Sequence, residues 1–295
     1  MPALHVALAV LVAVAWGGAF LATRLALDVF SPSQLTALRF LIAAVPALVI
    51  PRPRVAGNVL VGIGLTLFAG QFLFQFFAIA SGVPPGLAAT VVQMQAVFTI
   101  ALAAVALGQR PTARQSGGIV LGLAGLLVIA TTVGEDLSVF GLTLALLSAL
   151  SWSAGNVLLA RVRGVDILHV VVWASLVPPL PALFLSMAVD GPGAMRVALT
   201  RASVVAVAAA IYLGAIATVA AYATWGALLR RHPVAVVAPF GLLTPFVAAC
   251  GSSLAFGERF GPARLAGMGL VLLGLAVIVA PSRRSSPETV ARSSA

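Results

Sequence analysis

Long apolar runs alternate with short polar segments along most of the chain. A helix needs about 20 apolar residues to cross the hydrocarbon core of a bilayer, and about ten runs reach that length between charges or Pro and Gly breaks. This pattern predicts an all-α integral membrane protein. The expected transmembrane helices are 4–23, 32–50, 57–80, 84–107, 113–131, 139–160, 169–189, 202–229, 233–256 and 262–281.

The two ends of the chain differ in pattern. No basic segment precedes the first apolar run and further runs follow at once, so we interpret it as a retained helix rather than a secretory signal. After Pro281 the chain reads SRRSSPETVARSSA, which is polar enough to stay unfolded. We expect residues 282–295 to form a disordered cytoplasmic tail.

The second half of the chain repeats the first. A shift of 149 residues, which carries position 108 to position 257, lays GQRPTARQSGGIVLGLAGLLVI (108–129) over GERFGPARLAGMGLVLLGLAVI (257–278). Because each repeat, 1–131 and 139–281, then holds an odd number of helices, the two must be inverted relative to each other, as in secondary transporters. Further matched pairs are Gly118 with Gly267, Gly125 with Gly274, Pro84 with Pro233, and Phe76 with Trp225.

Composition supports the membrane assignment. Hydrophobic residues make up 61% of the chain and charged residues 8%, with a mean hydropathy of +1.14, whereas soluble domains carry about 25% charged residues. The net charge is +10, but the 17 basic residues are all arginines scattered between apolar runs. They form no basic face with aromatic stacking residues, so we expect the lipid bilayer and no nucleic acid as a partner.

Arginine placement orients the helices. With a cytoplasmic N-terminus, arginines are more frequent in the inside segments than outside, which favours both termini inside. Arg259 and Arg264 on the outer side count against this orientation, so a missed or extra span stays open. The inside arginines would be Arg52, Arg54, Arg110, Arg114, Arg161, Arg163, Arg230, Arg231, Arg283, Arg284 and Arg292, and those outside or near the outer ends Arg24, Arg39, Arg196, Arg201, Arg259 and Arg264.

No cofactor or metal site and no catalytic residue is expected. Cys250 is the only cysteine, and His5, His169 and His232 are far apart at the ends of predicted spans. A membrane-embedded enzyme acting on a lipid would need clustered acids, histidines or a metal motif, and the spans contain none.

Four glutamines interrupt two neighbouring apolar spans. Gln93 and Gln95 occur in GLAATVVQMQAVFTI (86–100), and on a regular helix they point about 200° apart. Gln71 and Gln75 are four residues apart and share one face. An unpaired amide is costly in hydrocarbon, so these side chains either line a substrate cavity or bond a neighbouring helix.

Aromatic and polar residues form three further stripes at helical spacing. We expect Trp16, Trp152, Asn156, Tyr222 and Trp225 to line the cavity, although aromatic residues near span ends also occur as interfacial anchors. Asn156, next to Gly155, could equally serve helix packing. The full stripes are Trp16, Phe20 and Thr23; Ser148, Trp152 and Asn156; and Thr218, Tyr222 and Trp225.

Charges within the spans bear on mechanism. Arg39 is the one deep charge and could bind a substrate carboxylate by two hydrogen bonds; the alternatives are a pair with Asp28 or extension of the side chain to the interface. No acid falls in the middle third of a predicted span, so a buried proton relay is poorly supported. Gly118 and Gly122 form a GxxxG pattern, which indicates close packing within the bundle or a homodimer seam.

Several segments resemble a known family. AWGGAFLATRLAL (15–27), LRF (38–40), LGQRPTARQSGG (107–118), and AIATVAAYATWGALLRRHPVAVVAPFGLLTPFVAA (215–249) with the FGERF that follows are similar to the drug/metabolite transporter superfamily, EamA branch. Within that branch, GLAATVVQMQAVFTI and LSWSAGNVLLARV resemble bacterial exporters of cysteine and O-acetylserine. One departure is Gln109, where the first-half motif usually has the glutamate that Glu258 keeps in the second half.

The resemblance implies ten helices, a bacterial cytoplasmic membrane and export of small polar metabolites. We expect an amino-acid exporter that works by alternating access. Because the predicted midplane offers amides, hydroxyls and aromatic rings, we expect transport down the substrate's own gradient or by exchange. A drug or nucleotide-sugar permease of the same superfamily is the alternative.

Overall fold

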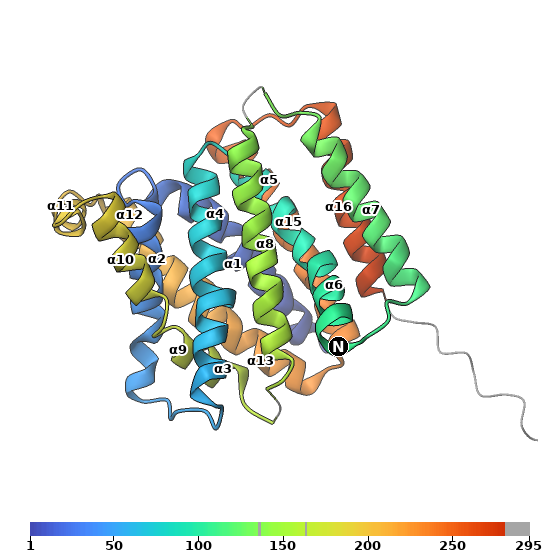
Figure 1. Cartoon of the computed structure of the whole chain (residues 1–295), viewed down its shortest axis with the longest axis horizontal. Helices are drawn as coiled ribbons and strands as arrows, with labels where there is room; N and C mark the ends of the chain where they lie inside the picture. The colour runs from blue at the N-terminus through green and yellow to red at the C-terminus, as the bar shows by residue number, and fades with distance from the viewer. Residues whose placement is uncertain (135–136, 163, 281–295) are drawn as a thin grey trace, which may run out of the picture.

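The computed structural model describes residues 1–134, 137–162 and 164–280. Within these ranges the chain is helical and contains no β-strand (Figure 1). Nine of the described helices are long and apolar enough to cross a membrane, and Pro32–Leu48 is a shorter apolar helix, which we count as the second span of the first half. The predicted tail and the acids Glu135 and Asp136 lie outside the described residues.

Each half contains five spans in the same order. The first half consists of α1 (Ala3–Ala26); α2 (Pro32–Ala44) with the short η1 (Val45–Leu48); α3 (Gly57–Ile63), η2 (Gly64–Gly70) and α4 (Gln71–Ala80); α5 (Pro85–Val91), η3 (Val92–Met94) and α6 (Gln95–Leu107); and α7 (Ala113–Ala130). Helices occupy all five predicted spans of this half, with ends within a few residues; four are long enough to cross a membrane, and 32–50 stays a prediction as a transmembrane span.

The second half follows the same plan and contains one additional helix. Its spans are α8 (Val139–Leu159); α9 (Ile167–Ala174) and α10 (Pro179–Val189); α12 (Val204–Ile211), η4 (Tyr212–Ala220) and α13 (Ala221–Arg231); α14 (Val234–Val237), η5 (Ala238–Leu242) and α15 (Leu243–Phe256); and α16 (Pro262–Val279). The additional helix, α11 (Ala194–Thr200), lies between the second and third spans and has no counterpart in the first half.

Local signals in the sequence explain several helix ends. Ser31 with Gln34 caps α2, and Thr112 with Gln115 caps α7, each as a reciprocal capping box that satisfies two backbone N–H groups. Gly108 and Gly257 end α6 and α15 with φ of +65° and +68°, a left-handed conformation that glycine adopts without steric cost. These two glycines match under the 149-residue shift, so the repeat extends to the backbone.

Irregular helix geometry also repeats. The third span of each half contains a π-helical segment, η2 in the first half and η4 in the second. The fourth span of each half contains a 3₁₀ segment, η3 or η5. Segments of π-helix are rare and frequently occur at functional sites, so their presence in both repeats directs attention to the middle of these spans.

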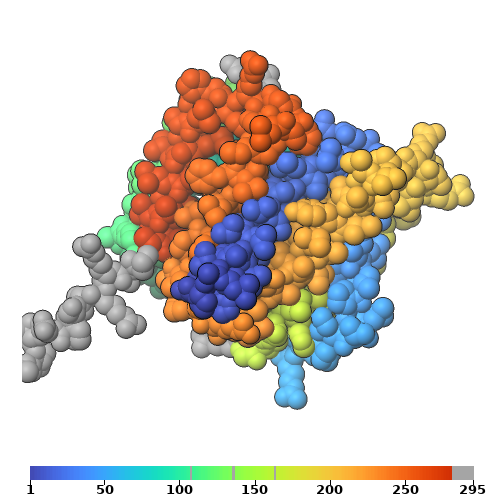
Figure 2. Space-filling model, turned by 180° about the vertical axis from the view of Figure 1, so that it is seen from behind, coloured from blue at the N-terminus to red at the C-terminus, as the bar shows by residue number. Residues whose placement is uncertain are grey.

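The two halves interlock through glycines. A Cβ at Gly64 in η2 would lie 2.8 Å from the backbone oxygen of Ala174 and 2.5 Å from Val177 Cβ. A Cβ at Gly214 in η4 would lie 2.7 Å from the oxygen of Arg39 and 2.6 Å from Ile42 Cβ. The third span of each half thus packs closely on the second span of the other half, and α1 lies among α12, α13 and α15 (Figure 2).

The fifth spans, α7 and α16, stand side by side at one edge of the bundle (Figure 1). Gly118 packs on the backbone of Gly274, and Gly125 packs on that of Gly267. Gly122 faces Val97 and Met94 of the neighbouring fourth span. Of the two interpretations of the GxxxG pattern, packing within the bundle is therefore the one the structure shows.

Candidate substrate site

Arg39 lies deep in the bundle, where the two halves meet. Its side chain comes from α2 and is 3% exposed. The Nε–H donates a hydrogen bond to Thr218 Oγ1 of η4 at 3.1 Å, and the guanidinium carbon Cζ lies 3.8 Å from the centre of the Phe72 ring. The second nitrogen, Nη1, is buried and makes no hydrogen bond to a described residue.

Both alternative interpretations of Arg39 are wrong. Asp28 instead bonds Arg24, one turn away on an exposed part of the chain. The buried guanidinium does not reach an interface, because Thr218 and Phe72 hold it among the spans. A buried cation without a matching anion costs several kcal/mol, so the fold keeps the Arg39 side chain here at a cost to stability.

Aromatic rings from both halves surround this centre. Trp16 lies 5.5 Å from Tyr222 and 5.1 Å from Trp225, measured between ring centres. Tyr222 continues to Phe68 at 6.4 Å, and Phe72 lies 6.4 Å from Trp152. The predicted residues Trp16, Tyr222 and Trp225 thus come together in one cluster, which the phenylalanines connect to Trp152.

Hydrogen bonds between the halves hold the first spans against the π segments. Trp16 Nε1 donates to the backbone oxygen of Ala217 in η4 at 3.0 Å, and Tyr212 Oη donates to that of Ala15 at 2.8 Å. In the other half Ser151 Oγ donates to the oxygen of Thr66 in η2 at 2.7 Å. Since these tryptophan and tyrosine contacts lie within the bundle, they are not those of interfacial anchors.

Trp152 and Asn156 form a second polar group. Trp152 Nε1 donates to Asn156 Oδ1 at 3.1 Å, and Asn156 Nδ2 donates to Thr99 Oγ1 at 3.4 Å, which joins α8 to α6. Gly155 packs on Leu67, where an added Cβ would lie 2.6 Å from Leu67 Cβ. Gly155 therefore serves packing, while Asn156 is half-buried and bonded on both sides of its amide.

The four glutamines pair within their own spans. Gln71 Nε2 donates to Gln75 Oε1 at 2.7 Å, and both side chains are buried; Gln71 Oε1 has no described partner. Gln95 Nε2 donates to Gln93 Oε1 at 3.2 Å. The expectation that Gln93 and Gln95 point to opposite sides is wrong, because η3 interrupts the regular helix between them.

Sequence reasoning missed some contributors. Phe72 and Phe40 flank Arg39, with their ring centres 5.4 Å apart, and Tyr212 anchors α1. The four-residue spacing of Phe68, Phe72 and Phe76 was a signal for one aromatic face. No pattern indicated the π segments. Among the described residues no group of three or more His, Cys, Asp or Glu side chains could hold a metal ion.

Comparison with known proteins agrees with this architecture. The model of the EamA-like transporter family matches residues 3–131 and 139–280. The chain is 37% identical to the "Probable amino-acid metabolite efflux pump" of Salmonella typhimurium and 36% to that of Escherichia coli K12, in each case covering 92% of this chain and 93% of the relative. It is 30% identical to the "Probable terminal-alkyne amino-acid exporter" of Streptantibioticus cattleyicolor, covering 91% of each chain.

A solved crystal structure shares the fold with a TM-score of 0.64 at 21% identity, over 97% of this chain and all of the other. The two family matches fall on the two halves, and the spans match the membrane architecture described above. The chain therefore belongs to the EamA-like transporter family and is a multi-pass membrane transporter, not an enzyme.

Proposed function

We propose that the protein exports small zwitterionic amino acids, of the size of cysteine and O-acetylserine, across a bacterial cytoplasmic membrane. Three relatives with amino-acid efflux or export in their names support this substrate class. The proposed route alternates access to the centre around Arg39, which side chains from both halves surround. Alternating access between inverted repeats is the usual design of such carriers.

One observation carries the proposal: Arg39 is buried at the meeting of the halves with Nη1 unbonded among the described residues. A substrate carboxylate is the natural partner for that nitrogen, because arginine binds carboxylates through charge-assisted hydrogen bonds. The buried oxygen Gln71 Oε1, also without a described partner, is an acceptor of the kind an ammonium group needs. A single arginine suits one carboxylate better than the diphosphate of a nucleotide sugar.

We further propose that both termini are cytoplasmic. The connections and adjoining helix ends on the side where α1 begins hold seven described arginines, against five on the opposite side, a difference in the direction of the positive-inside rule. The counted residues are Arg52, Arg54, Arg110, Arg114, Arg161, Arg230 and Arg231 against Arg24, Arg196, Arg201, Arg259 and Arg264. Reporter fusions after Arg54 and Arg231 should give cytoplasmic signals, and an external signal at Arg231 would contradict this orientation.

The placement of acids supports transport without proton coupling. All four described acids, Asp28, Asp166, Asp190 and Glu258, lie in connections or at helix ends rather than in mid-span. A proton-coupled carrier usually keeps a titrating group deep in the membrane. The substrate's own gradient, or exchange, would then drive flux.

The test is uptake into liposomes that contain the purified protein, with a panel of radiolabelled amino acids and with ionophores that remove the pH difference and the membrane potential. We expect a small neutral amino acid to equilibrate under these conditions. The variant Arg39→Gln should lose uptake, while Arg259→Gln, which changes an exposed arginine in the connection before α16, should keep it. If neither the wild type nor the Arg259→Gln control takes up any amino acid of the panel, the proposed substrate class is refuted.

A further inference from the structure

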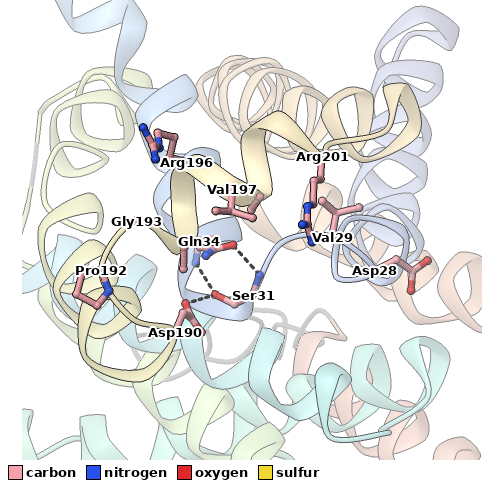
Figure 3. Close-up of a pocket in the computed structure, with 12 residues that line it drawn as sticks. Asp28, Val29, Ser31, Gln34, Asp190, Pro192, Gly193, Arg196, Val197 and Arg201 are labelled. Carbon is pink, nitrogen blue, oxygen red and sulfur yellow. Dashed lines mark hydrogen bonds between the residues drawn. The ribbon is translucent and has the colours of Figure 1, made fainter.

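A cavity that Arg39 does not line opens between the α1–α2 connection and α11 (Figure 3). Its volume is about 730 Å³. The lining combines the side chains of three kinds of residue: carboxylates, guanidinium groups and small apolar groups. The polar members are Asp28, Ser31, Gln34, Asp190, Arg196 and Arg201. In the proposed orientation this cavity faces the outside, and it sits at the edge of the bundle where α10, α11 and α12 lie (Figure 1).

The carboxylate of Asp190 is fixed in the wall of the cavity. Ser31 Oγ and Ser186 Oγ both donate to the same oxygen, Oδ2, the latter at 2.7 Å. Ser31 is itself held by its capping box with the buried Gln34. The second oxygen of Asp190, Oδ1, makes no hydrogen bond to a described residue, so a fixed anionic group remains able to accept further hydrogen bonds.

Two arginines, Arg196 on α11 and Arg201 directly after it, supply the opposite charge. Neither the Arg196 nor the Arg201 guanidinium forms a hydrogen bond or ion pair with a described residue, although both side chains line the same cavity as Asp190. An exposed arginine without a protein partner is commonly solvated and does not by itself indicate a binding site. Here, however, they share a cavity with a carboxylate that they do not neutralise. The cavity therefore offers separate sites for an anionic and a cationic group.

Exposed apolar side chains on α10 lead towards the cavity, which suits a molecule that has both charged groups and hydrocarbon chains. Leu180, Phe184 and Met187 follow one face of α10 towards Asp190, and the first two are each 75% exposed. Val204 at the start of α12 is also exposed. In a membrane this apolar stripe would contact acyl chains, and Asp190, which directly follows α10, would then lie near the depth of the lipid headgroups.

We propose that this cavity binds one phospholipid with a zwitterionic ethanolamine headgroup. The phosphate binds one of the two guanidinium groups, that of Arg196 or that of Arg201, since guanidinium groups suit phosphate oxygens. The primary ammonium donates to Asp190, and the acyl chains lie along the exposed face of α10. A choline headgroup lacks N–H groups and cannot make the bond to Asp190. Because α11 is absent from the first half, the site occurs once per chain.

The test is native mass spectrometry of the full chain, purified in detergent, stripped of lipid and titrated separately with phosphatidylethanolamine, phosphatidylcholine and phosphatidylglycerol. We expect wild type to bind one phosphatidylethanolamine about tenfold more tightly than the double variant Arg196→Gln/Arg201→Gln, as the loss of charge-assisted hydrogen bonds implies. The matched control Arg259→Gln should bind like wild type. Asp190→Asn should abolish the preference for ethanolamine over choline.

Two results would overturn the proposal. The first is equal binding of phosphatidylethanolamine by wild type and the double variant, which changes only exposed side chains and should fold like wild type. The second is displacement of the lipid by free phosphoethanolamine at an equal concentration, which would show that the cavity binds a soluble zwitterion. Neither result bears on uptake through the Arg39 site, which the liposome assay measures by itself.

Discussion

The second spans of the two halves, α2 and α9, occupy the same place in their repeats and carry different chemistry. A glycine from the π segment of the other half packs against the backbone of each: Gly214 against Arg39 of α2, and Gly64 against Ala174 of α9. Backbone packing is thus repeated, because a Cβ added to either glycine would lie 2.7 or 2.8 Å from a carbonyl oxygen. The side chain is a guanidinium in one half and a methyl group in the other, so helix packing is symmetric, while the group proposed to bind the substrate carboxylate occurs in one half only.

The largest effect is expected at the charged side of this pair. Arg39→Gln should lower substrate binding by about thirtyfold to several thousandfold, because loss of one partner of a buried charge pair costs about 2–5 kcal/mol. Arg39→Lys should retain part of the binding, since the charge remains and the second donor is lost. Binding of the transported amino acid by purified protein measures both. Equal binding by wild type and Arg39→Gln would place anion recognition elsewhere.

The packing side of the comparison predicts equal effects. Gly64→Ala and Gly214→Ala should each destabilise the protein by about 1–3 kcal/mol, because the new methyl group would overlap backbone and β-branched side chains. Thermal unfolding in detergent compares the two variants, with Gly117→Ala as a control at a position with no neighbour within 4 Å. Tolerance of one substitution and not the other would show that the halves are not packed alike.

Trp16 and Trp152 occupy corresponding positions in the first spans of the two halves but have different hydrogen-bond partners, so their substitution should lower stability by different, smaller amounts. Trp16→Phe leaves the Ala217 carbonyl without its donor and should cost about 1 kcal/mol, the net value of a hydrogen bond. Trp152→Phe should cost less, since its partner is the side chain of Asn156, which keeps its bond to Thr99. Thermal unfolding of both variants gives the order, and the reverse order would contradict this account.

The smallest predicted effect concerns pH and again appears in one half only. His5 Nδ1 and His232 Nε2 lie 2.7 Å apart where α1 begins, whereas the corresponding contact in the other half is Gly141 against Val83. Partial burial, and then the charges of His5, the N-terminus and Arg231, lower the pKa of His232 below its usual value.

Protonation of His232 is therefore less favourable in the folded protein than in the unfolded chain. The stability that depends on its neutral form is present at pH 7.5 and is lost as the pH falls below the unfolded value of about 6.5. Thermal unfolding between pH 7.5 and 5.5 should show a decrease in Tm that is smaller in His232→Gln. An identical pH dependence in His169→Gln and His232→Gln would contradict this assignment.

The spans could be predicted from sequence because span length and hydrophobicity are local properties. The repeat was found only in part, since the 149-residue shift aligns the third to fifth spans. The first and second spans correspond at shorter shifts: Trp16 with Trp152, and the start of α2 at Pro32 with that of α9 at Ile167. Insertion of α11 changes the shift, and a search at one fixed offset cannot detect such a change.

The candidate site was less predictable than the spans. Stripes at helical spacing identified Trp16, Tyr222 and Trp225, which meet in one cluster. The spacing argument failed for Gln93 and Gln95, because a 3₁₀ segment changes the direction of side chains without a local sequence signal. The bond from Arg39 to Thr218 joins segments 179 residues apart, and periodicity within one helix contains no information about such pairs.

On the proposed alternating-access cycle, the π segments would allow the transporter to change shape without unfolding a span. A π turn holds one residue more than an α turn, so a segment that returns to α geometry rotates the helix beyond it by about 100° and advances it by about 1.5 Å. Each segment accepts a hydrogen bond from the opposite half: η2 from the Ser151 side chain and η4 from the Trp16 side chain. On the proposed cycle, one of these two hydrogen bonds would break while the other forms. The helices around Arg39 would then rotate to open the centre to one side of the membrane and afterwards to the other.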